Sequence, residues 1–266
     1  MKKNDLSGLD MAGTIEWYGQ NEATIMGRLP KSTNTPTGIT VHGMLDTLTP
    51  AEIYGVFRRF PTQARQRMIV RTVTMFDPLW FSKDSMPNAP KVTLNVQDAI
   101  SETAIVPSFV QYTMDTTQWC GYGGHIQLYT IHETAATLAV RKIIHTQALC
   151  HELAHCLITP ELREGCTLMF PNETFHTVKL FSDFSKLANR FGPISHYASA
   201  YCDKDGILLE KDTQLPINEA MAEAITAYLL GFAYQPNGNG LHPFQGARRK
   251  ELWPLIYNYL HATRMT

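Results

Sequence analysis

The sequence predicts an α+β fold, a twisted mixed sheet with helices followed by a mostly helical C-terminal part. Apolar runs with many β-branched residues at 67–76, 105–114 and 125–131 are typical of strands. The run 133–158 contains neither glycine nor proline and indicates one or two helices. After it, apolar residues recur mainly at helical spacing. The main sheet is therefore expected before about residue 131, and helices after it.

The part of the chain before residue 100 contains one clearly bounded helix. Residues 1–37 are expected to be irregular, because turn-forming residues are frequent toward their end. A helix is predicted at 49–60, where Thr49 can cap the first turn and Glu52 completes a capping box. A further strand is predicted at 91–96.

Helices also account for most of the chain after residue 158. The long helical run should end before Pro160, because proline has no N–H group and clashes with the preceding turn. Asparagine at the start and glycine at the end are typical helix boundaries. The predicted helices are 172–192, from Asn172 to Gly192; 218–231, from Asn218 to Gly231; and 250–265.

Composition excludes several classes of function. The net charge is −1, so no basic excess indicates a nucleic-acid partner. No apolar stretch is long enough for a membrane span, and the N-terminus lacks the apolar core of a secretion signal. Five cysteines, an odd number, favour reduced thiols. We expect a cytoplasmic protein, or an effector exported by a signal-independent route, with neither a nucleic-acid nor a membrane partner.

The sequence HELAH (151–155) carries the strongest chemical signal. His151 and His155 stand four positions apart and share one helix face, so both imidazoles can bind one metal ion. A catalytic zinc ion takes three protein ligands and keeps one position for water. Glu152 lies beside that face and can accept a proton from the water. Leucines at 149, 153 and 157 can bury the opposite stripe of the helix.

The sequence NEAMAE (218–223) can supply the third ligand of one zinc ion per chain. Glu219 and Glu223 are again one helical turn apart. Glu219 can bind the metal while Glu223 accepts a hydrogen bond from the outer nitrogen of a ligand histidine, which orients the ring. Alanines between them allow close helix packing, so we favour this interpretation over two solvated glutamates near a helix start.

These motifs resemble those of a known class of enzymes. HELAH followed by a helix with NExxAE looks like the glutamate zincins, the thermolysin-like clan of metallopeptidases. SHYA (195–198) upstream of that helix is similar to the anthrax lethal factor family. The resemblance covers about residues 125–231 and implies a zincin-like fold, with Glu219 as third ligand and Glu223 behind it. It also implies that the strand 125–131 forms the rim of the cleft and binds extended substrate.

The resemblance further implies that Tyr197 donates a hydrogen bond to the oxyanion of the reaction. This sequence departs from the family pattern, because Tyr197 lies 22 positions before Glu219 with an insertion between them. His196 and Tyr201 are therefore alternative donors.

Two further residues are alternative metal ligands. Glu161 stands six positions after His155, where metzincins place a third ligand, but the glycine that their turn needs is Ile158 here. Cys166 lies in an EGC sequence similar to that of peptide deformylase, but it follows the helix instead of preceding it. Both are weaker candidates than Glu219.

Taken together, the residues and the resemblance predict a zinc metalloendopeptidase that hydrolyses a protein or peptide substrate. We expect residues 1–266 to form one catalytic domain of two lobes, an α/β lobe at 1–158 and a helical lobe at 159–266, with the active-site cleft between them. Two other functions stay open. One is a metal-dependent amidase or deformylase-like hydrolase of small molecules, and the other is a binding protein that keeps the fold without catalysis.

Overall fold

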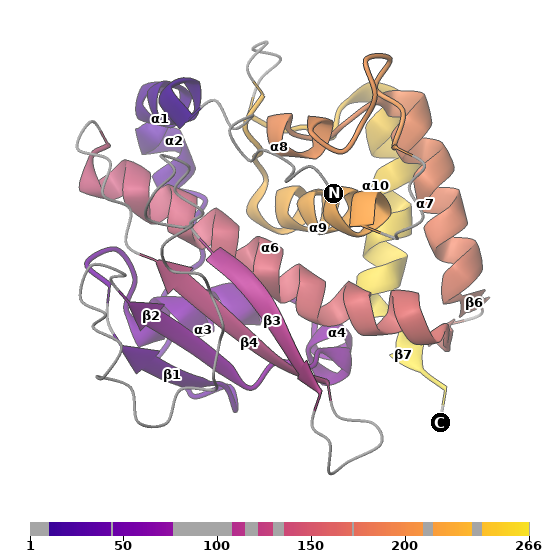
Figure 1. Cartoon of the computed structure of the whole chain (residues 1–266), viewed down its shortest axis with the longest axis horizontal. Helices are drawn as coiled ribbons and strands as arrows, with labels where there is room; N and C mark the ends of the chain where they lie inside the picture. The colour runs from indigo at the N-terminus through magenta and orange to yellow at the C-terminus, as the bar shows by residue number, and fades with distance from the viewer. Residues whose placement is uncertain are drawn as a thin grey trace.

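The computed structural model shows an α+β protein built around one long helix, α6 (Leu138–Glu164) (Figure 1). A four-stranded sheet lies on one side of α6, and most of the C-terminal helices lie on the other. The α+β class predicted from the sequence is thus confirmed. The structure describes residues 11–43, 45–76, 108–114, 122–129, 136–171, 173–209, 215–235 and 241–265.

The four-stranded sheet has the order β1-β2-β4-β3. Strands β1, β2 and β4 are parallel to one another, and β3 is antiparallel to β4. Buried side chains of β2 and β4, such as Val73 and Ile126, belong to the core. The strand predicted at 91–96 lies outside the described residues. The strands are β1 (Thr40–Gly43), β2 (Thr72–Phe76), β3 (Ser108–Met114) and β4 (Tyr122–Tyr129).

Two short helices near the N-terminus correct the expectation that residues 1–37 are irregular. They are α1 (Met11–Gln20) and α2 (Glu22–Met26). Glycines within α1 weaken its intrinsic helix propensity, which hid it from sequence reasoning. The buried side chains of Tyr18 and Ile25 join the core beside α6, and this packing stabilises what propensity alone does not. Residues 29–37, the last part of this range, contain no helix or strand, as predicted.

The predicted helix at 49–60 is confirmed as α3 (Pro50–Arg59), and α4 (Thr62–Arg67) follows it. Thr49 accepts a hydrogen bond from the N–H of Glu52 at 3.3 Å, and the Glu52 carboxylate accepts one from the N–H of Thr49 at 2.8 Å. This reciprocal pair is the predicted capping box. Glu52 also forms an ion pair with Lys142, which ties the start of α3 to α6.

Helix α6 continues through Pro160, which corrects the prediction that it ends before this residue. Proline cannot donate to the carbonyl four residues earlier, which here belongs to Cys156. The N–H of Ile69 donates to that carbonyl at 3.1 Å instead. A segment some ninety positions earlier thus satisfies the oxygen that the proline leaves free, and the helix runs on to Glu164. Its N-cap is Thr137, which accepts from the N–H of Val140.

A small second sheet follows α6 and corrects the predicted start of the next helix. Residues 173–176 form a strand, so α7 (Thr177–Phe191) begins at Thr177 and not after Asn172. His176 stands at its N-cap position without a side-chain cap. Gly192 ends the helix with φ 73°, as predicted. The strand order of this sheet is β6-β5-β7, with β5 (Thr167–Phe170), β6 (Glu173–His176) and β7 (Thr263–Arg264).

The remaining helices are α8 (His196–Ser199), α9 (Leu215–Leu230) and α10 (Gly246–His261), which contains Pro254. Of these, α9 packs against α6 and α7, α8 packs against α9, and α10 packs against α7 and α9. Helix α9 begins before Asn218, so that residue is not its N-cap as predicted, whereas Gly231 ends it with φ 77° as predicted. Buried alanines of α9, at 220, 222, 224 and 227, let it pack closely against α6.

The two predicted lobes meet within a continuous helix. The proposed boundary between residues 158 and 159 falls inside α6, so the backbone joins the two sides without a linker. Within the described residues, no helix combines the length and the apolar character needed to cross a membrane.

Candidate metal centre

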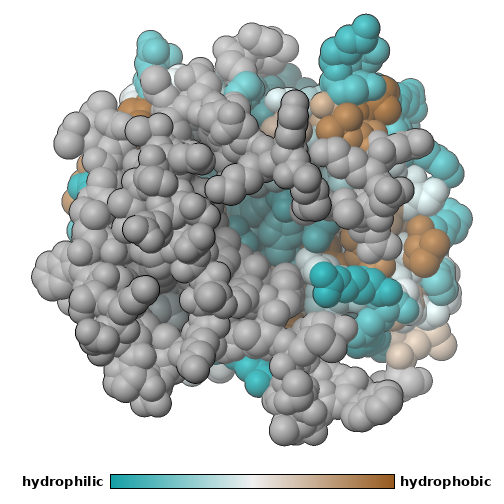
Figure 2. Space-filling model, in the orientation of Figure 1, coloured by the Kyte–Doolittle hydropathy of each residue, from teal (hydrophilic) through white to brown (hydrophobic). Residues whose placement is uncertain are grey.

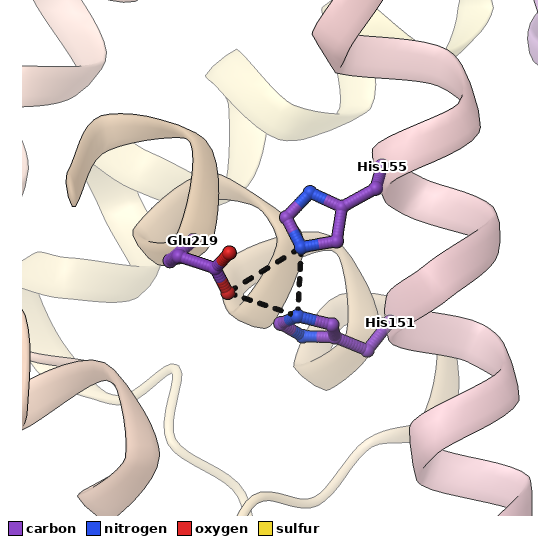
Figure 3. A group of neighbouring side chains, drawn as sticks. All are labelled: His151, His155 and Glu219. Carbon is purple, nitrogen blue, oxygen red and sulfur yellow. Dashed lines mark hydrogen bonds and ion pairs between the residues drawn. The ribbon is translucent and has the colours of Figure 1, made fainter. Parts of the chain in front are cut away.

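Three side chains from two helices converge at one point (Figure 3). His151 and His155 project from α6, and Glu219 projects from α9. The two Nε2 atoms lie 2.9 Å apart, and the Oε2 atom of Glu219 lies 3.2 Å from His151 Nε2 and 3.4 Å from His155 Nε2. All three residues are buried. The structure thus brings together the three side chains that the sequence predicted as metal ligands, although they are up to 68 positions apart.

The outer nitrogen of each histidine contacts an oxygen. His151 Nδ1 lies 2.7 Å from the Oε1 atom of Glu223, in the arrangement that the sequence predicted for this glutamate. His155 Nδ1 lies 3.0 Å from Oδ1 of Asn218. The other end of the Asn218 amide donates to Thr159 Oγ1 at 2.9 Å, which keeps its oxygen toward the histidine. Both Nδ1 atoms therefore carry the ring proton and donate it.

The inner nitrogens then meet as acceptors. With the protons at Nδ1, each Nε2 atom turns a lone pair toward the other ring and toward the carboxylate of Glu219. Three acceptors at this spacing repel one another unless a cation, either a proton or a metal ion, lies among them. Ligands placed tetrahedrally around zinc at about 2.0–2.1 Å stand about 3.3–3.4 Å apart, close to the observed 2.9–3.4 Å. This group could hold a metal ion.

The charges of the group are strongly coupled. Burial lowers the pKa of His151, but hydrogen bonds to Glu219 and Glu223 outweigh burial and raise it well above its usual value. Burial raises the pKa of Glu219, but hydrogen bonds to His151 and His155 outweigh it and hold this pKa well below its usual value. Glu219 is therefore an ionised carboxylate, the form that binds a metal ion.

Glu152 lies beside the ligand group and is not part of it. It is buried on α6, and its charge contributes to raising the pKa of Tyr201. Among the described residues, only His151, His155 and Glu219 form a cluster of potential metal ligands. Glu152 thus lies next to His151 in the chain but outside this cluster. The sequence predicted this position for a residue that acts on water and does not bind the metal.

Two tyrosines lie at the edge of the group. The hydroxyl of Tyr197 donates to Glu219 Oε2 at 3.3 Å, and its ring meets the ring of His151 edge-on, with centroids 5.5 Å apart. The hydroxyl of Tyr201 lies 3.0 Å from that of Tyr197. Burial and the charge of Glu219 raise the pKa of Tyr201 to about 12, so its hydroxyl keeps its proton at neutral pH.

The other candidate residues lie away from this group. Glu161 accepts from Arg67 at 2.9 Å and 3.0 Å and from the hydroxyl of Tyr259 at 2.6 Å. Cys166 lies beyond the end of α6, and burial, together with the charge of Glu161, raises the pKa of its thiol. The ring of His196 packs against Tyr234, with centroids 5.5 Å apart. None of the three is a member of the cluster of potential metal ligands found among the described residues.

The strand expected to form the rim of the cleft lies inside the sheet and not at its edge. The sequence places this strand at 125–131, but β4 (Tyr122–Tyr129) is paired on both sides, with β2 and with β3. In the described part of the sheet, β3 is the outer strand on this side, and it contacts α6. The antiparallel strand β3, and not β4, therefore presents an edge beside the helix that carries the two histidines.

Hydrophilic residues lie at the bottom of a hollow near the middle of the face drawn in Figure 2, where Figure 1 places α6 and α9. Sequence reasoning missed three polar contacts around the ligand group: Asn218 with His155, Thr159 with Asn218, and Ser195 with Glu223. Asn218 directly precedes Glu219, and Thr159 stands four positions after His155. Helical spacing could thus have indicated these two, whereas Ser195 stood out only as the first residue of SHYA, and no local signal indicates its contact with Glu223.

Comparisons with protein-family models, with curated protein sequences and with solved structures each gave no match.

Proposed function

We propose that this protein is a zinc-dependent metalloendopeptidase with a zincin-like fold. The convergence of His151, His155 and Glu219, with a second carboxylate at Glu152 beside them, carries the proposal. Two imidazoles and one carboxylate are a donor set that suits a catalytic zinc ion, which leaves room for water. When bound, such an ion would activate a water molecule and polarise a carbonyl group.

The residues of the chain supply the proton transfers and the positioning. Glu152 would accept a proton from the attacking water and pass it to the leaving amine. Glu223 and Asn218 hold the two rings so that both Nε2 lone pairs face inward. Tyr197, or its neighbour Tyr201, would donate a hydrogen bond to the oxyanion as the carbonyl carbon becomes tetrahedral. The Tyr197 hydroxyl donates to Glu219, and the Tyr201 hydroxyl reaches the group through its hydrogen bond with Tyr197.

The position of β3 favours a peptide substrate over a small molecule. An extended peptide can add to the outer edge of a sheet by backbone hydrogen bonds, in either direction. Strand β3 (Ser108–Met114) offers such an edge next to α6 in the described part of the sheet. We propose that substrate lies along β3, in place of the strand that the sequence predicted. An amidase or deformylase-like hydrolase would have no need of this edge.

The decisive experiment combines metal analysis of the purified protein with turnover of a peptide library. Glu152→Gln keeps the shape of the side chain but removes the base, so we expect turnover to fall by about 10²–10⁴-fold. Bound metal should be unchanged, because Glu152 is not a ligand. Glu164→Gln is the matched control, since Glu164 is on the same helix but exposed beside Arg264.

Two outcomes would refute the proposal. Unchanged turnover in the Glu152→Gln protein would show that this carboxylate takes no part in the reaction. A native protein that holds one metal ion per chain but cleaves no peptide would favour the binding protein without catalysis.

A further inference from the structure

A single buried hydroxyl links the ligand group to the segment that carries the tyrosines. Ser195 donates a hydrogen bond to the Oε2 atom of Glu223, and it accepts one from the N–H of Ala198 at 3.0 Å. A hydroxyl has one proton to donate and lone pairs to accept with, so both bonds form at once. Ser195 and Glu223 are both buried, which excludes solvent as a ready replacement for either bond.

The bond to Glu223 completes an oriented chain. The two oxygens of this carboxylate have different partners, Oε1 with His151 Nδ1 at 2.7 Å and Oε2 with Ser195. Fixing both oxygens fixes the rotation of the carboxylate, and this in turn fixes the proton of His151 at Nδ1. Groups that orient a ligand histidine in this way raise metal affinity by about 10–100-fold.

The hydrogen bond from the N–H of Ala198 links Ser195 to the helix that carries Tyr197. Ser195 is the N-cap of α8, which spans only His196–Ser199. So short a helix is not stable alone, and the cap holds its first turn. Tyr197 lies within this turn and donates to Glu219, the third ligand, at 3.3 Å. Ser195 thus reaches His151 through Glu223 and reaches Glu219 through Tyr197.

We propose that Ser195 is a positioning residue that holds two of the three metal ligands, His151 and Glu219, in register with the tyrosine segment. This role depends on the metal site of the proposed function but not on peptidase activity. The hydroxyl would tie three elements, α6, α8 and α9, into one preformed site. Its loss should weaken metal binding even though none of the three ligand side chains is removed.

The test measures zinc affinity, by competition with a chromophoric chelator, in the absence of substrate. We expect Ser195→Ala to weaken zinc binding by at least about tenfold. Ser199→Ala is the matched control, because the Ser199 hydroxyl lies in the same helix but donates only to the backbone oxygen of His196. Its zinc affinity should stay within twofold of the native value. Circular dichroism verifies that both variants are folded.

A double-mutant cycle separates this role from a general loss of structure. If Ser195 acts through Glu223, the Ser195→Ala change should weaken zinc binding far less in a Glu223→Ala background than in the native protein. Full additivity would overturn the coupling, and so would a Ser195→Ala protein that binds zinc within twofold of native.

A second variant at position 195 tests the proposal if the alanine variant does not fold. If Ser195→Ala does not fold, Ser195→Cys, with a weaker donor of similar shape, should show an intermediate loss, and native affinity in that variant would also refute the proposal. A native protein that binds zinc but cleaves nothing would refute the peptidase function alone, because the affinity measurements would stand.

Discussion

Helix α6 carries two buried clusters of charge that differ in one respect. Near its end, Glu161 faces Arg67 and the hydroxyl of Tyr259, so donors within the protein satisfy the carboxylate. Two turns earlier, His151 and His155 face Glu219 with three inward acceptors. In the first cluster, which we call complete, the protein itself supplies the donors that the carboxylate needs. In the second, the inward acceptors need a cation among them. The difference distinguishes a structural ion pair from a binding site on the same helix.

The largest effect on stability is expected from breaking the complete cluster. Arg67→Met removes the cation and leaves Glu161 buried without its partner, which should lower the free energy of unfolding by about 3–5 kcal/mol. Urea denaturation at pH 7 measures the loss. Zinc affinity should be unchanged, because the two clusters do not share a side chain. A loss below about 1 kcal/mol would show that the pair contributes little.

The same variant has an expected pH dependence. Burial raises the pKa of Glu161 even in the presence of Arg67, and removing Arg67 would raise it further. The folded variant then holds a proton that the unfolded chain, with a pKa of about 4.3, releases as the pH rises. The destabilisation should therefore be smaller at pH 5 than at pH 7. An equal or greater loss at pH 5 would contradict this account of Glu161.

The next largest effect on stability is expected when a metal ion binds to the open cluster, which consists of His151, His155 and Glu219. Zinc at about one hundred times its dissociation constant should raise the free energy of unfolding by about 2.7 kcal/mol. For a chain of this size the melting temperature should rise by roughly 5–10 °C. Differential scanning fluorimetry with and without zinc measures the shift. It should persist in Arg67→Met and vanish in His151→Ala; a shift that survives in His151→Ala would place the bound metal elsewhere.

A smaller effect is expected at the edge of the open cluster. Tyr197→Phe removes the hydrogen bond to Glu219 and should weaken zinc binding by up to about tenfold, the equivalent of about 0.5–1.5 kcal/mol. Tyr201→Phe removes only the contact with Tyr197 and is the matched control. Chelator competition compares the two. A larger loss in Tyr201→Phe would reverse the roles of the two hydroxyls.

The smallest effect on stability should come from neutralising the open cluster without metal. Without metal, the carboxylate of Glu219 holds a proton on His151, and in Glu219→Gln the amide can donate to a neutral Nε2 atom instead, so the metal-free protein should change by less than about 1 kcal/mol. Glu161→Gln, the same substitution in the complete cluster, should cost several times more. Comparable losses in the two variants would remove the distinction between the clusters. Zinc binding should be lost only in Glu219→Gln.

Sequence reasoning succeeded where the signal is local. The spacing of His151 and His155, and that of Glu219 and Glu223, depends only on the helical repeat, so each pair could be placed on one face without a structure. The capping box of Thr49 and Glu52 and the glycine at 231 are local in the same sense. Their geometry follows from a few neighbouring residues.

Sequence reasoning failed where partners are distant in the chain. Pro160 indicates a helix end, but the N–H of Ile69 satisfies the free carbonyl of Cys156, and this contact was not predictable from either segment. The small sheet depends on pairing of 168–169 with 263–264, about 95 positions away. A strand pattern likewise does not reveal whether β4 or β3 takes the outer position.

The sequence alone determined which residues can bind a metal and which of them share a helix face, because side-chain chemistry and the helical repeat are local properties. Only the tertiary structure decided that α9 packs on α6 closely enough for Glu219 to meet both histidines, and that Ser195, 28 positions before Glu223, contacts it. Burial and packing choose such partners, and they act between segments whose separation along the chain carries no signal of their contact.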